Sequence, residues 1–380
     1  MYDLTIIGGG PAGCRLAMLL AKDRRVMVVE EHGSAGRPLQ CAGLVSPRTV
    51  DGVTKKSVLL EIRDFTLHSP GGGRIELHSK EVGGVVIDRS LFDLSLAEKA
   101  ADLGAEFLFS TKAGEVNVKD GSVIVPCKSE RRQRDVESSL LVGADGPRSV
   151  VRGAVTRERF KMLYKGAQLE GTLPSGGDGA VEMWIGNRVA PGFFAWKIPA
   201  GDAVRIGLCT NADDPPMSLL KSFAKKYFPE LKVTDKQSGL IPVGPIGRLA
   251  KGRLALLGDA GGQTKPITGG GVFLGKRAAE MLAETVAEEG ACPHALSRYE
   301  RLYSDELGSQ ISRAWLVRKV INRLSDKKLD RAVEILSEKP VLRILERDGD
   351  IDDPAGMSSA ILLKAPRLLQ FAPTVLRSMG

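Results

Sequence analysis

Short apolar runs and amphipathic stretches alternate at the start of this chain. Residues 2–7 form a mainly apolar run, which predicts a buried strand, and residues 26–29 form a second such run. Between them, residues 12–22 have a helix-forming composition with apolar positions at helical spacing. Residues 1 to about 45 therefore predict a strand–helix–strand unit.

The hydrophobic pattern of the rest of the chain indicates a mixed α and β protein. The further predicted elements are, in chain order, a helix over 90–103, a strand over 105–109, a hairpin turning at Asp120-Gly121, buried strands over 140–144 and 254–257, a β-rich stretch over 163–210, a helix over 271–288, and mostly helical sequence from 297 to 380.

This order predicts an α/β fold (mixed α+β) in which a Rossmann-like domain is interrupted by a β-rich substrate domain and followed by a helical C-terminal region. We expect the cofactor-binding domain to be assembled from three separate segments, 1–70, 91–160 and 246–296. Residues 71–90 are expected to make an excursion into the substrate domain, residues 161–245 to form its β-sheet, and residues 297–380 to form the helical region.

A glycine-rich turn follows the first predicted strand with the spacing Gly8-x-Gly10-x-x-Gly13. Such glycines allow a tight turn, close approach of the backbone to a pyrophosphate, and close packing of helix on strand. Pro11 suits the first helical turn. Glu30 ends the second strand about 20 residues on, where an acid binds a ribose hydroxyl. A plain tight turn and a solvated acid are the alternatives, and the full arrangement favours a dinucleotide site.

Two later segments are also rich in glycine. Gly143-Ala144-Asp145-Gly146 ends one predicted buried strand, and Gly258-Asp259-Ala260 ends another, with Gly269-Gly270-Gly271 opening the helix that follows. An aspartate at a strand end can accept hydrogen bonds from ribityl hydroxyls, and the positive end of a helix favours the anion formed when a flavin is reduced. Together the three segments predict an FAD enzyme.

Composition narrows the class further. The chain has 380 residues and a net charge of +8, a mild excess that fits solubility and would favour anionic partners such as phospholipid surfaces or an acidic electron carrier. Five cysteines without a CxxC pair argue against a disulfide framework and favour a reducing compartment. The four histidines are dispersed. We expect no metal site, no nucleic-acid partner and no transmembrane helix.

Residues 1–320 resemble the geranylgeranyl reductase family, FAD flavoproteins of the aromatic-hydroxylase superfamily. In that superfamily the segment around Asp145, with Ser149, contacts FAD and the nicotinamide donor, and the segment around Asp259 holds the FAD ribitol and ribose. The resemblance implies the following FAD-binding residues: Gly8, Gly10, Ala12, Gly13, Glu30, Glu31, Arg37, Cys41, Ala42, Gly43, Arg89, Asp145, Gly146, Gly258, Asp259, Gly270, Gly271 and Val272.

The segment from Pro38 to Leu44 resembles the stretch in which this family has a cysteine and a glycine after a proline. The family places that cysteine near the isoalloxazine ring. Cys41 is therefore the catalytic candidate, either as a proton donor or as a thiol that gates the flavin. A buried, inert thiol is an equally weighted alternative, because free cysteines are commonly buried.

A second segment, Pro191 to Pro199, resembles the family pattern Pro-x-x-Tyr-x-Trp-x-Phe-Pro followed by a spaced Gly-x-Gly. This chain departs from the pattern at three positions, with Phe194 for the tyrosine, Ile198 for the phenylalanine and Cys209 for the second glycine. Aromatic side chains on a sheet suit an isoprenoid tunnel. The substrate candidates are Phe194, Trp196 and Pro199, with ordinary sheet packing as the alternative.

The resemblance implies an FAD-dependent oxidoreductase that saturates C=C bonds of geranylgeranyl chains in archaeal-type membrane lipids. Hydride would come from the flavin. There is no second GxGxxG that would indicate a separate NAD(P)H domain, so the expected electron donor is either NAD(P)H or ferredoxin. The alternatives are an FAD-dependent monooxygenase, a menaquinone side-chain reductase, a flavin halogenase and a non-catalytic lipid carrier.

The expected partners are a prenylated lipid and an electron-carrier protein, and the expected location is the cytoplasm. The C-terminal sequence adds a membrane option, because basic residues between 313 and 328 alternate with apolar ones, and residues 360–371 are rich in leucine. A basic amphipathic helix can lie on the cytoplasmic face of an anionic bilayer. Packing of the same helices into the core, with a solvated polar face, is the alternative.

Overall fold

A nine-stranded sheet is built around the predicted strand–helix–strand unit. The computed structural model describes residues 1–130, 132–174, 176 and 179–371. The sheet has the central order β10-β11-β12-β1-β2-β8, with β19 beside β12, β18 beside β19 and β9 beside β11. Its strands are β1 (Tyr2–Ile7), β2 (Val26–Val29), β8 (Glu106–Leu108), β9 (Lys112–Ala113), β10 (Asn117–Val118), β11 (Val123–Lys128), β12 (Gln133–Gly143), β18 (Ala250–Lys251) and β19 (Leu254–Leu256).

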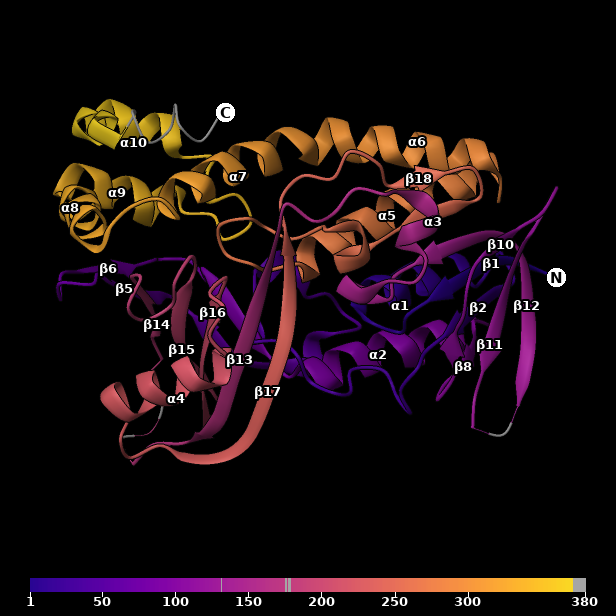
Figure 1. Cartoon of the computed structure of the whole chain (residues 1–380), viewed down its shortest axis with the longest axis horizontal. Coiled ribbons are helices and arrows are strands. Elements are labelled where there is room, and N and C mark those ends of the chain that lie inside the picture. The colour runs from indigo at the N-terminus through magenta and orange to yellow at the C-terminus, as the bar shows by residue number, and fades with distance from the viewer. Residues whose placement is uncertain (131, 175, 177–178, 372–380) are drawn as a thin grey trace.

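The strands β19, β12, β1, β2 and β8 run parallel and are joined through helices. The helices of this layer are α1 (Pro11–Leu20), α2 (Arg89–Asp102), α3 (Arg152–Val155), α5 (Val272–Glu289) and α6 (Pro293–Tyr303). Helix α1 packs against both α2 and α5, and α5 packs against α6. Figure 1 shows these helices beside the strands of the sheet. Buried apolar residues of the helices and of the sheet form one core cluster. This confirms the predicted α/β layer.

A second, seven-stranded sheet carries the β-rich part of the chain. Its order is β17-β13-β16-β15-β14-β5-β6. Its strands are β5 (Asp64–His68), β6 (Arg74–His78), β13 (Met162–Thr172), β14 (Val181–Ile185), β15 (Phe194–Ala200), β16 (Ala203–Thr210) and β17 (Lys232–Val243). Helix α4 (Pro216–Tyr227) packs on one face of this sheet (Figure 1). A three-stranded sheet, β3 (Leu44–Val45), β7 (Gly84–Ile87) and β4 (Val58–Ile62), completes the β structure of the described residues.

The end of the described chain is helical, as predicted. Its elements are a π-helical turn (Ser304–Gly308), α7 (Ser309–Ile321), α8 (Asp326–Leu336), α9 (Lys339–Asp348), α10 (Ser358–Lys364) and the 3-10 segment η6 (Pro366–Phe371). Figure 1 shows α6 and α7 running along one edge of the molecule, with α8 to α10 beyond them. Among the described residues, no helix is both long enough and apolar enough to span a membrane.

Short 3-10 segments join these elements close to the motifs singled out above. They are η1 (Pro47–Thr49), η2 (Lys55–Ser57), η3 (Gly146–Arg148) and η4 (Gly258–Gly261). The boundaries predicted for the cofactor and substrate domains stay an interpretation of the chain.

Candidate functional site

The three glycine segments lie against one another. Gly8 has a φ of +106°, and a Cβ atom there would lie 2.3 Å from the carbonyl oxygen of Ala144. The Cβ of Ala12 lies 3.3 Å from the position a Cβ would take at Gly258 and 3.2 Å from that at Gly275. The first segment therefore touches both of the others, although each is far from it along the chain.

The glycines of the first turn differ in what surrounds them. A Cβ at Gly13 would lie 2.2 Å from the carbonyl oxygen of Gly8, so the start of α1 packs directly on the turn. A Cβ at Gly10 would meet no atom within 4 Å. Gly10 thus borders open space at the N-terminus of α1, where a pyrophosphate would find free N–H groups and the positive end of the helix dipole.

Glu30 is buried at the end of β2 and holds the glycine turn. Its Oε2 accepts a hydrogen bond from Gly9 N at 2.7 Å, and its Oε1 accepts one from His32 N at 2.8 Å. His32 Nδ1 lies 2.7 Å from the same Oε1. Glu31 is exposed and approaches only the His32 ring in the described structure. Of the two adjacent acids, Glu30 is the one that the fold turns toward the cofactor loop.

Asp145 retains a carboxylate oxygen that no described donor satisfies. Its Oδ2 accepts a hydrogen bond from Val150 N at 2.7 Å, which closes the turn around Gly146. Its Oδ1 is buried without a partner. Burial raises the pKa of the Asp145 carboxyl, against the effect of the Ser149 hydroxyl and the backbone N–H groups. A buried polar atom without a hydrogen bond is costly, so this oxygen suits a donor on a bound ligand.

The Asp259 carboxylate has no hydrogen-bond donor among the described side chains and backbone groups. It projects from η4, and its Oδ1 lies 2.9 Å from the position a Cβ would take at Gly271. Burial raises the pKa of Asp259 to about 6, and the nearby charge of Arg89 opposes this effect. Hydrogen bonds from ribityl hydroxyls would supply the missing donors. The contacts of both aspartates therefore fit a bound flavin nucleotide.

Helix α5 begins at Val272, directly after Gly270 and Gly271, and Lys265 braces the loop that leads to it. A Cβ at Gly270 would lie 2.9 Å from Lys265 Cε. Lys265 Nζ donates to Asp352 Oδ1 at 2.8 Å, and both side chains are buried. The C-terminal region therefore contributes directly to the shape of the predicted flavin-binding loop.

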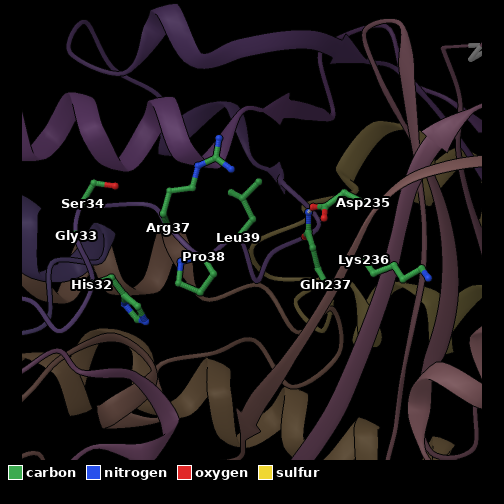
Figure 2. Close-up of a pocket in the computed structure, with 9 residues that line it drawn as sticks. All are labelled: His32, Gly33, Ser34, Arg37, Pro38, Leu39, Asp235, Lys236 and Gln237. Carbon is green, nitrogen blue, oxygen red and sulfur yellow. Dashed lines mark hydrogen bonds between the residues drawn. The ribbon is translucent and has the colours of Figure 1, made fainter. Parts of the chain in front are cut away.

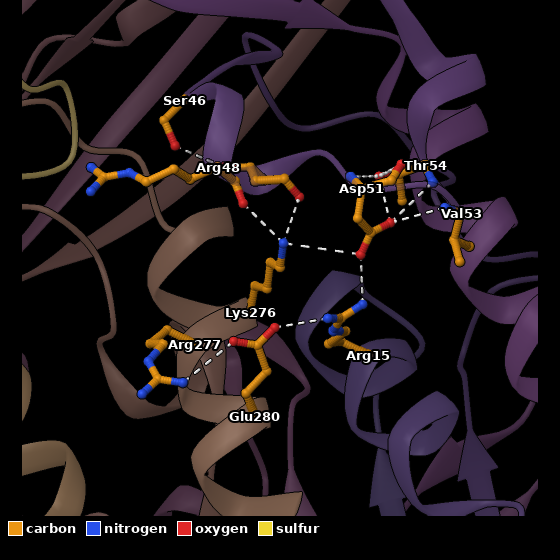
Figure 3. Close-up of polar contacts among 10 residues, drawn as sticks. Arg15, Ser46, Arg48, Asp51, Val53, Thr54, Lys276, Arg277 and Glu280 are labelled. Carbon is orange, nitrogen blue, oxygen red and sulfur yellow. Dashed lines mark hydrogen bonds and ion pairs between the residues drawn. The ribbon is translucent and has the colours of Figure 1, made fainter.

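Ion pairs connect α1 and α5 behind their N-termini. Arg15 bonds Asp51 at 2.7 Å and Glu280 at 2.8 Å. Lys276 donates to the carbonyl oxygens of Arg48 and Thr49 (Figure 3). Since several of these side chains are part-buried, the network fixes the two helix ends relative to each other.

Arg37 lines a cavity of about 540 Å³ between the loop after β2 and strand β17. The residues that line this cavity are His32, Gly33, Ser34, Arg37, Pro38, Leu39, Asp235, Lys236 and Gln237. Figure 2 shows that one group comes from the loop and the other from the strand. The predicted cofactor residue Arg37 therefore borders a cleft between the loop after β2 and the second sheet.

The Cys41–Gly43 segment is held from two sides. Arg89, on α2, forms an ion pair with Asp93 at 2.8 Å. Burial opposes the charge of Arg89, but Asp93 and the Cys41 thiol raise the pKa of Arg89 above its ordinary value. The thiol also accepts a hydrogen bond from Gly43 N at 3.4 Å. Cys41 thus lies between a buried cation and a backbone donor.

Arg205, a buried side chain on β16, anchors the same segment to the second sheet. It donates to the carbonyl oxygens of Ala42 and Ile87, each at 3.0 Å, and pairs with Glu170 at 2.8 Å. A Cβ at Gly43 would lie 2.2 Å from Arg205 Nη1, and Gly43 has a φ of +79°. The glycine that follows Ala42 is therefore required by the arginine packed on it.

Gln168 links Trp196 to the Cys41 backbone. The Trp196 indole N–H donates to Gln168 Oε1 at 3.0 Å, and Gln168 Nε2 donates to Cys41 O at 3.4 Å and to Gln237 Oε1 at 3.1 Å. The amide of Gln168 is buried. A substrate candidate and the catalytic candidate are thus joined through one side chain.

The three substrate candidates do not all share one face of β15. Phe194 stacks on Phe193 with ring centroids 4.5 Å apart, and its ring centroid lies 6.1 Å from that of Trp196. Both belong to the apolar cluster that also contains Ala42 and Leu44. Side chains alternate along a strand, so Pro199 has the opposite parity and lies on the other face. The structure brings together Phe194 and Trp196, but not Pro199.

Gly207 explains why the family pattern has a glycine after its tryptophan. It pairs with Trp196 across β15 and β16, and a Cβ there would lie 2.3 Å from the indole ring. The indole therefore lies over the glycine. Cys209, at the second position of that pattern, is buried beside Gly166, and burial raises its thiol pKa to about 12.

Sequence reasoning missed Arg205, Gln168, Lys265 and Asp352. None of them belongs to a motif, and each acts only through a partner that is distant in sequence. One signal was present in the sequence: side chains of a strand alternate between its two faces, which would have predicted Pro199 on the face opposite to Phe194 and Trp196.

Comparison with known proteins places the chain in a family. Residues 1–301 match the family described as FAD binding domain. Digeranylgeranylglycerophospholipid reductase 2 of Methanothermobacter thermautotrophicus is 31% identical over 90% of this chain and 94% of its own length. The digeranylgeranylglycerophospholipid reductase of Methanothrix thermoacetophila is 29% identical over 97% of both chains.

Solved structures share the fold. A geranylgeranyl bacteriochlorophyll reductase-like protein of Thermoplasma acidophilum has a TM-score of 0.85 at 22% identity, covering 98% of this chain and 99% of its own. A p-nitrophenol 4-monooxygenase of Pseudomonas putida has a TM-score of 0.72 at 17% identity, covering 92% and 97%. The fold and site define an FAD-binding protein. The chain belongs to the family that includes the digeranylgeranylglycerophospholipid reductases.

Proposed function

We propose that this protein uses FAD to saturate carbon–carbon double bonds of geranylgeranyl chains in archaeal-type membrane lipids. The observation that carries the proposal is the contact between the second sheet and the Cys41–Gly43 segment, which precedes β3. There, an apolar face with Phe194 and Trp196 meets this segment, and Arg89 beside Cys41 also interacts electrostatically with Asp259. The relatives named for digeranylgeranylglycerophospholipid reduction support this choice of substrate.

When bound, FAD supplies the hydride that adds to one alkene carbon. The residues of the chain do the rest. The N-terminus of α1 and Glu30 hold the adenosine half, and Asp259 with the start of α5 holds the flavin half. The aromatic face places the prenyl chain and excludes water. Cys41 Sγ, held by Gly43 N, donates the proton that completes the addition at the second carbon.

The electron donor is a separate proposal. We infer that NAD(P)H or a reduced ferredoxin supplies the two electrons, and that the donor approaches through the cleft lined by Arg37 and Lys236, whose positive charges suit an anionic partner. Bleaching of the flavin band under anaerobic mixing with each donor tests this. If neither donor bleaches the flavin, the proposed donor is wrong.

A peripheral contact with the membrane would give the enzyme access to its lipid. Leu363, on α10, is 82% exposed and Leu369 is 57% exposed, with Lys364 and Arg367 nearby in sequence. Apolar side chains flanked by cations suit an anionic lipid surface. In sedimentation with anionic vesicles, the wild type should be found in the vesicle pellet, and the Leu363→Asn variant should stay in the supernatant. Equal loss for Leu59→Asn, on a different exposed site, would contradict the assignment.

The test of the main proposal is anaerobic. Purified protein is reduced with dithionite, then mixed with digeranylgeranylglycerophospholipid. Flavin absorbance should return, and the lipid should gain two hydrogens for each bond reduced. Cys41→Ala should slow reoxidation while keeping FAD, whereas Cys292→Ala, a thiol outside the site, should not. Reoxidation that requires oxygen would indicate a monooxygenase. A gain of two hydrogens in the prenyl side chain of menaquinone, with none in the phospholipid, would indicate side-chain reduction of the quinone, whereas reduction of the quinone ring alone would not.

A further inference from the structure

Arg318 is a buried cation that no carboxylate of the described chain neutralises. It projects from α7 and is only 3% exposed. Its Nε donates to the carbonyl oxygen of Pro266 at 2.9 Å, and its Nη2 donates to that of Ile267. The guanidinium also lies over the ring of Phe193, 4.4 Å from the centroid.

This arrangement is costly for a residue with only a structural task. A buried charge loses several kcal/mol of solvation, which an ion pair or good hydrogen bonds must offset. The charged and titratable groups that face Arg318 are Tyr164, on β13, and Cys209, on β16, and neither carries a negative charge at neutral pH. Burial lowers the pKa of Arg318 to about 10, which leaves it charged at neutral pH.

The two carbonyl groups that Arg318 holds belong to the loop that leads into α5. Because a trans peptide is planar, its N–H points away from its C=O. Arg318 therefore turns the N–H groups of Ile267 and Thr268 away from α7. None of the described residues accepts a hydrogen bond from either N–H group, nor from those of Gly270 and Gly271.

We propose that Arg318 is a positioning residue that orients this loop toward the flavin and, by its own charge, favours the anionic form of the reduced flavin. The inference rests on the flavin site of the proposed function and deepens it. Asp259, Arg89, Lys265 and Asp352 are the other charged groups around the loop. Asp352 pairs with both Lys265 and Arg48, and Arg89 pairs with Asp93. Arg318 is therefore a positive charge beside the loop that has no ion-pair partner among the described residues.

The experiment measures the reduction potential of the bound flavin, without lipid, together with the near-ultraviolet spectrum of the reduced protein. Arg318→Met should disfavour two-electron reduction at least tenfold, which is about 30 mV for a two-electron couple, and shift the reduced spectrum toward the neutral form. Arg318→Lys should recover part of both effects. Arg313→Met removes an exposed arginine from the same helix and should change neither.

A wild-type potential and spectrum in flavin-loaded Arg318→Met would overturn the inference. If that variant does not fold or does not keep FAD, Arg318→Lys is measured in its place. The inference is then overturned if Arg313→Met lowers the reduction potential as much as Arg318→Lys does. Neither measurement depends on lipid turnover. Failure to reduce geranylgeranyl chains would therefore count against the proposed function alone.

Discussion

Replacing Asp259 with asparagine should stabilise the protein without FAD and weaken its hold on FAD. The carboxylate is buried near Gly271 with no donor among the described residues, and burial raises its pKa from 3.8 to about 6. Each pKa unit corresponds to about 1.4 kcal/mol, so the charged form costs the apo fold about 3 kcal/mol at most. The side chain keeps some exposure, and we expect about 1 to 3 kcal/mol.

The sign of the pH dependence follows from proton binding. Between pH 3.8 and about 6 the folded apo protein holds a proton on Asp259 that the unfolded chain has released. Proton binding by Asp259 therefore stabilises the folded apo protein most at low pH, and this stabilisation falls as the pH rises through that window. The asparagine variant has no such contribution. The variant should be more stable than the wild type at pH 7.5, and the difference should shrink toward pH 4.

Urea unfolding of both apo proteins at pH 4 and pH 7.5 measures the stability effect, with the exposed Asp23→Asn as control. Titration with FAD measures the second effect. Loss of hydrogen bonds to a charged acceptor, about 1.5 to 3 kcal/mol each, should weaken FAD binding at least tenfold. A variant that binds FAD as tightly as the wild type, or whose stability difference is equal at both pH values, would refute the reasoning.

Two further changes test the packing around the site. Gly207→Val should displace the Trp196 indole, because a Cβ there lies 2.3 Å from the ring; tryptophan fluorescence should shift and lipid turnover should fall while FAD stays bound, and unchanged turnover would show that the indole position is immaterial. Lys265→Met should cost about 2 kcal/mol in urea unfolding, because the buried Asp352 loses the charged donor on its Oδ1 and keeps only its bonds to the half-exposed Arg48. Adding Asp352→Asn should restore part of that loss, and a single-variant cost below about 1 kcal/mol would contradict the buried pair.

Elements with a clear hydrophobic pattern were predicted closely. The helix expected over 90–103 is α2 (Arg89–Asp102), and that expected over 271–288 is α5 (Val272–Glu289). Strand β12 begins at Gln133, well before the predicted 140–144. The hydrophobic pattern did not predict this first part of the strand, because its residues are polar and mostly exposed. They are held in the sheet by pairing with β11, which no local pattern reveals.

The predicted cofactor residues remain predictions, but the structure gathers many of them. Gly8, Ala12, Gly258 and the start of α5 touch, since glycines and small side chains permit close backbone contact wherever the chain brings them together. The Cys41 neighbourhood could not be predicted in the same way. Its anchors, Gln168 and Arg205, lie 127 and 163 residues further along the chain than the carbonyl groups they hold.

The sequence by itself determined the kinds of element, the family and the chemistry of the cofactor motifs, because strand and helix periods, turn glycines and strand-end acids are local properties. Only the tertiary structure decided which side chains meet at the site. Pairing across the second sheet sets Gln168 and Arg205 on the Cys41–Gly43 segment, and packing of α7 places Arg318 on the loop before α5. Such contacts depend on strand order and helix packing over long separations, which short-range patterns do not encode.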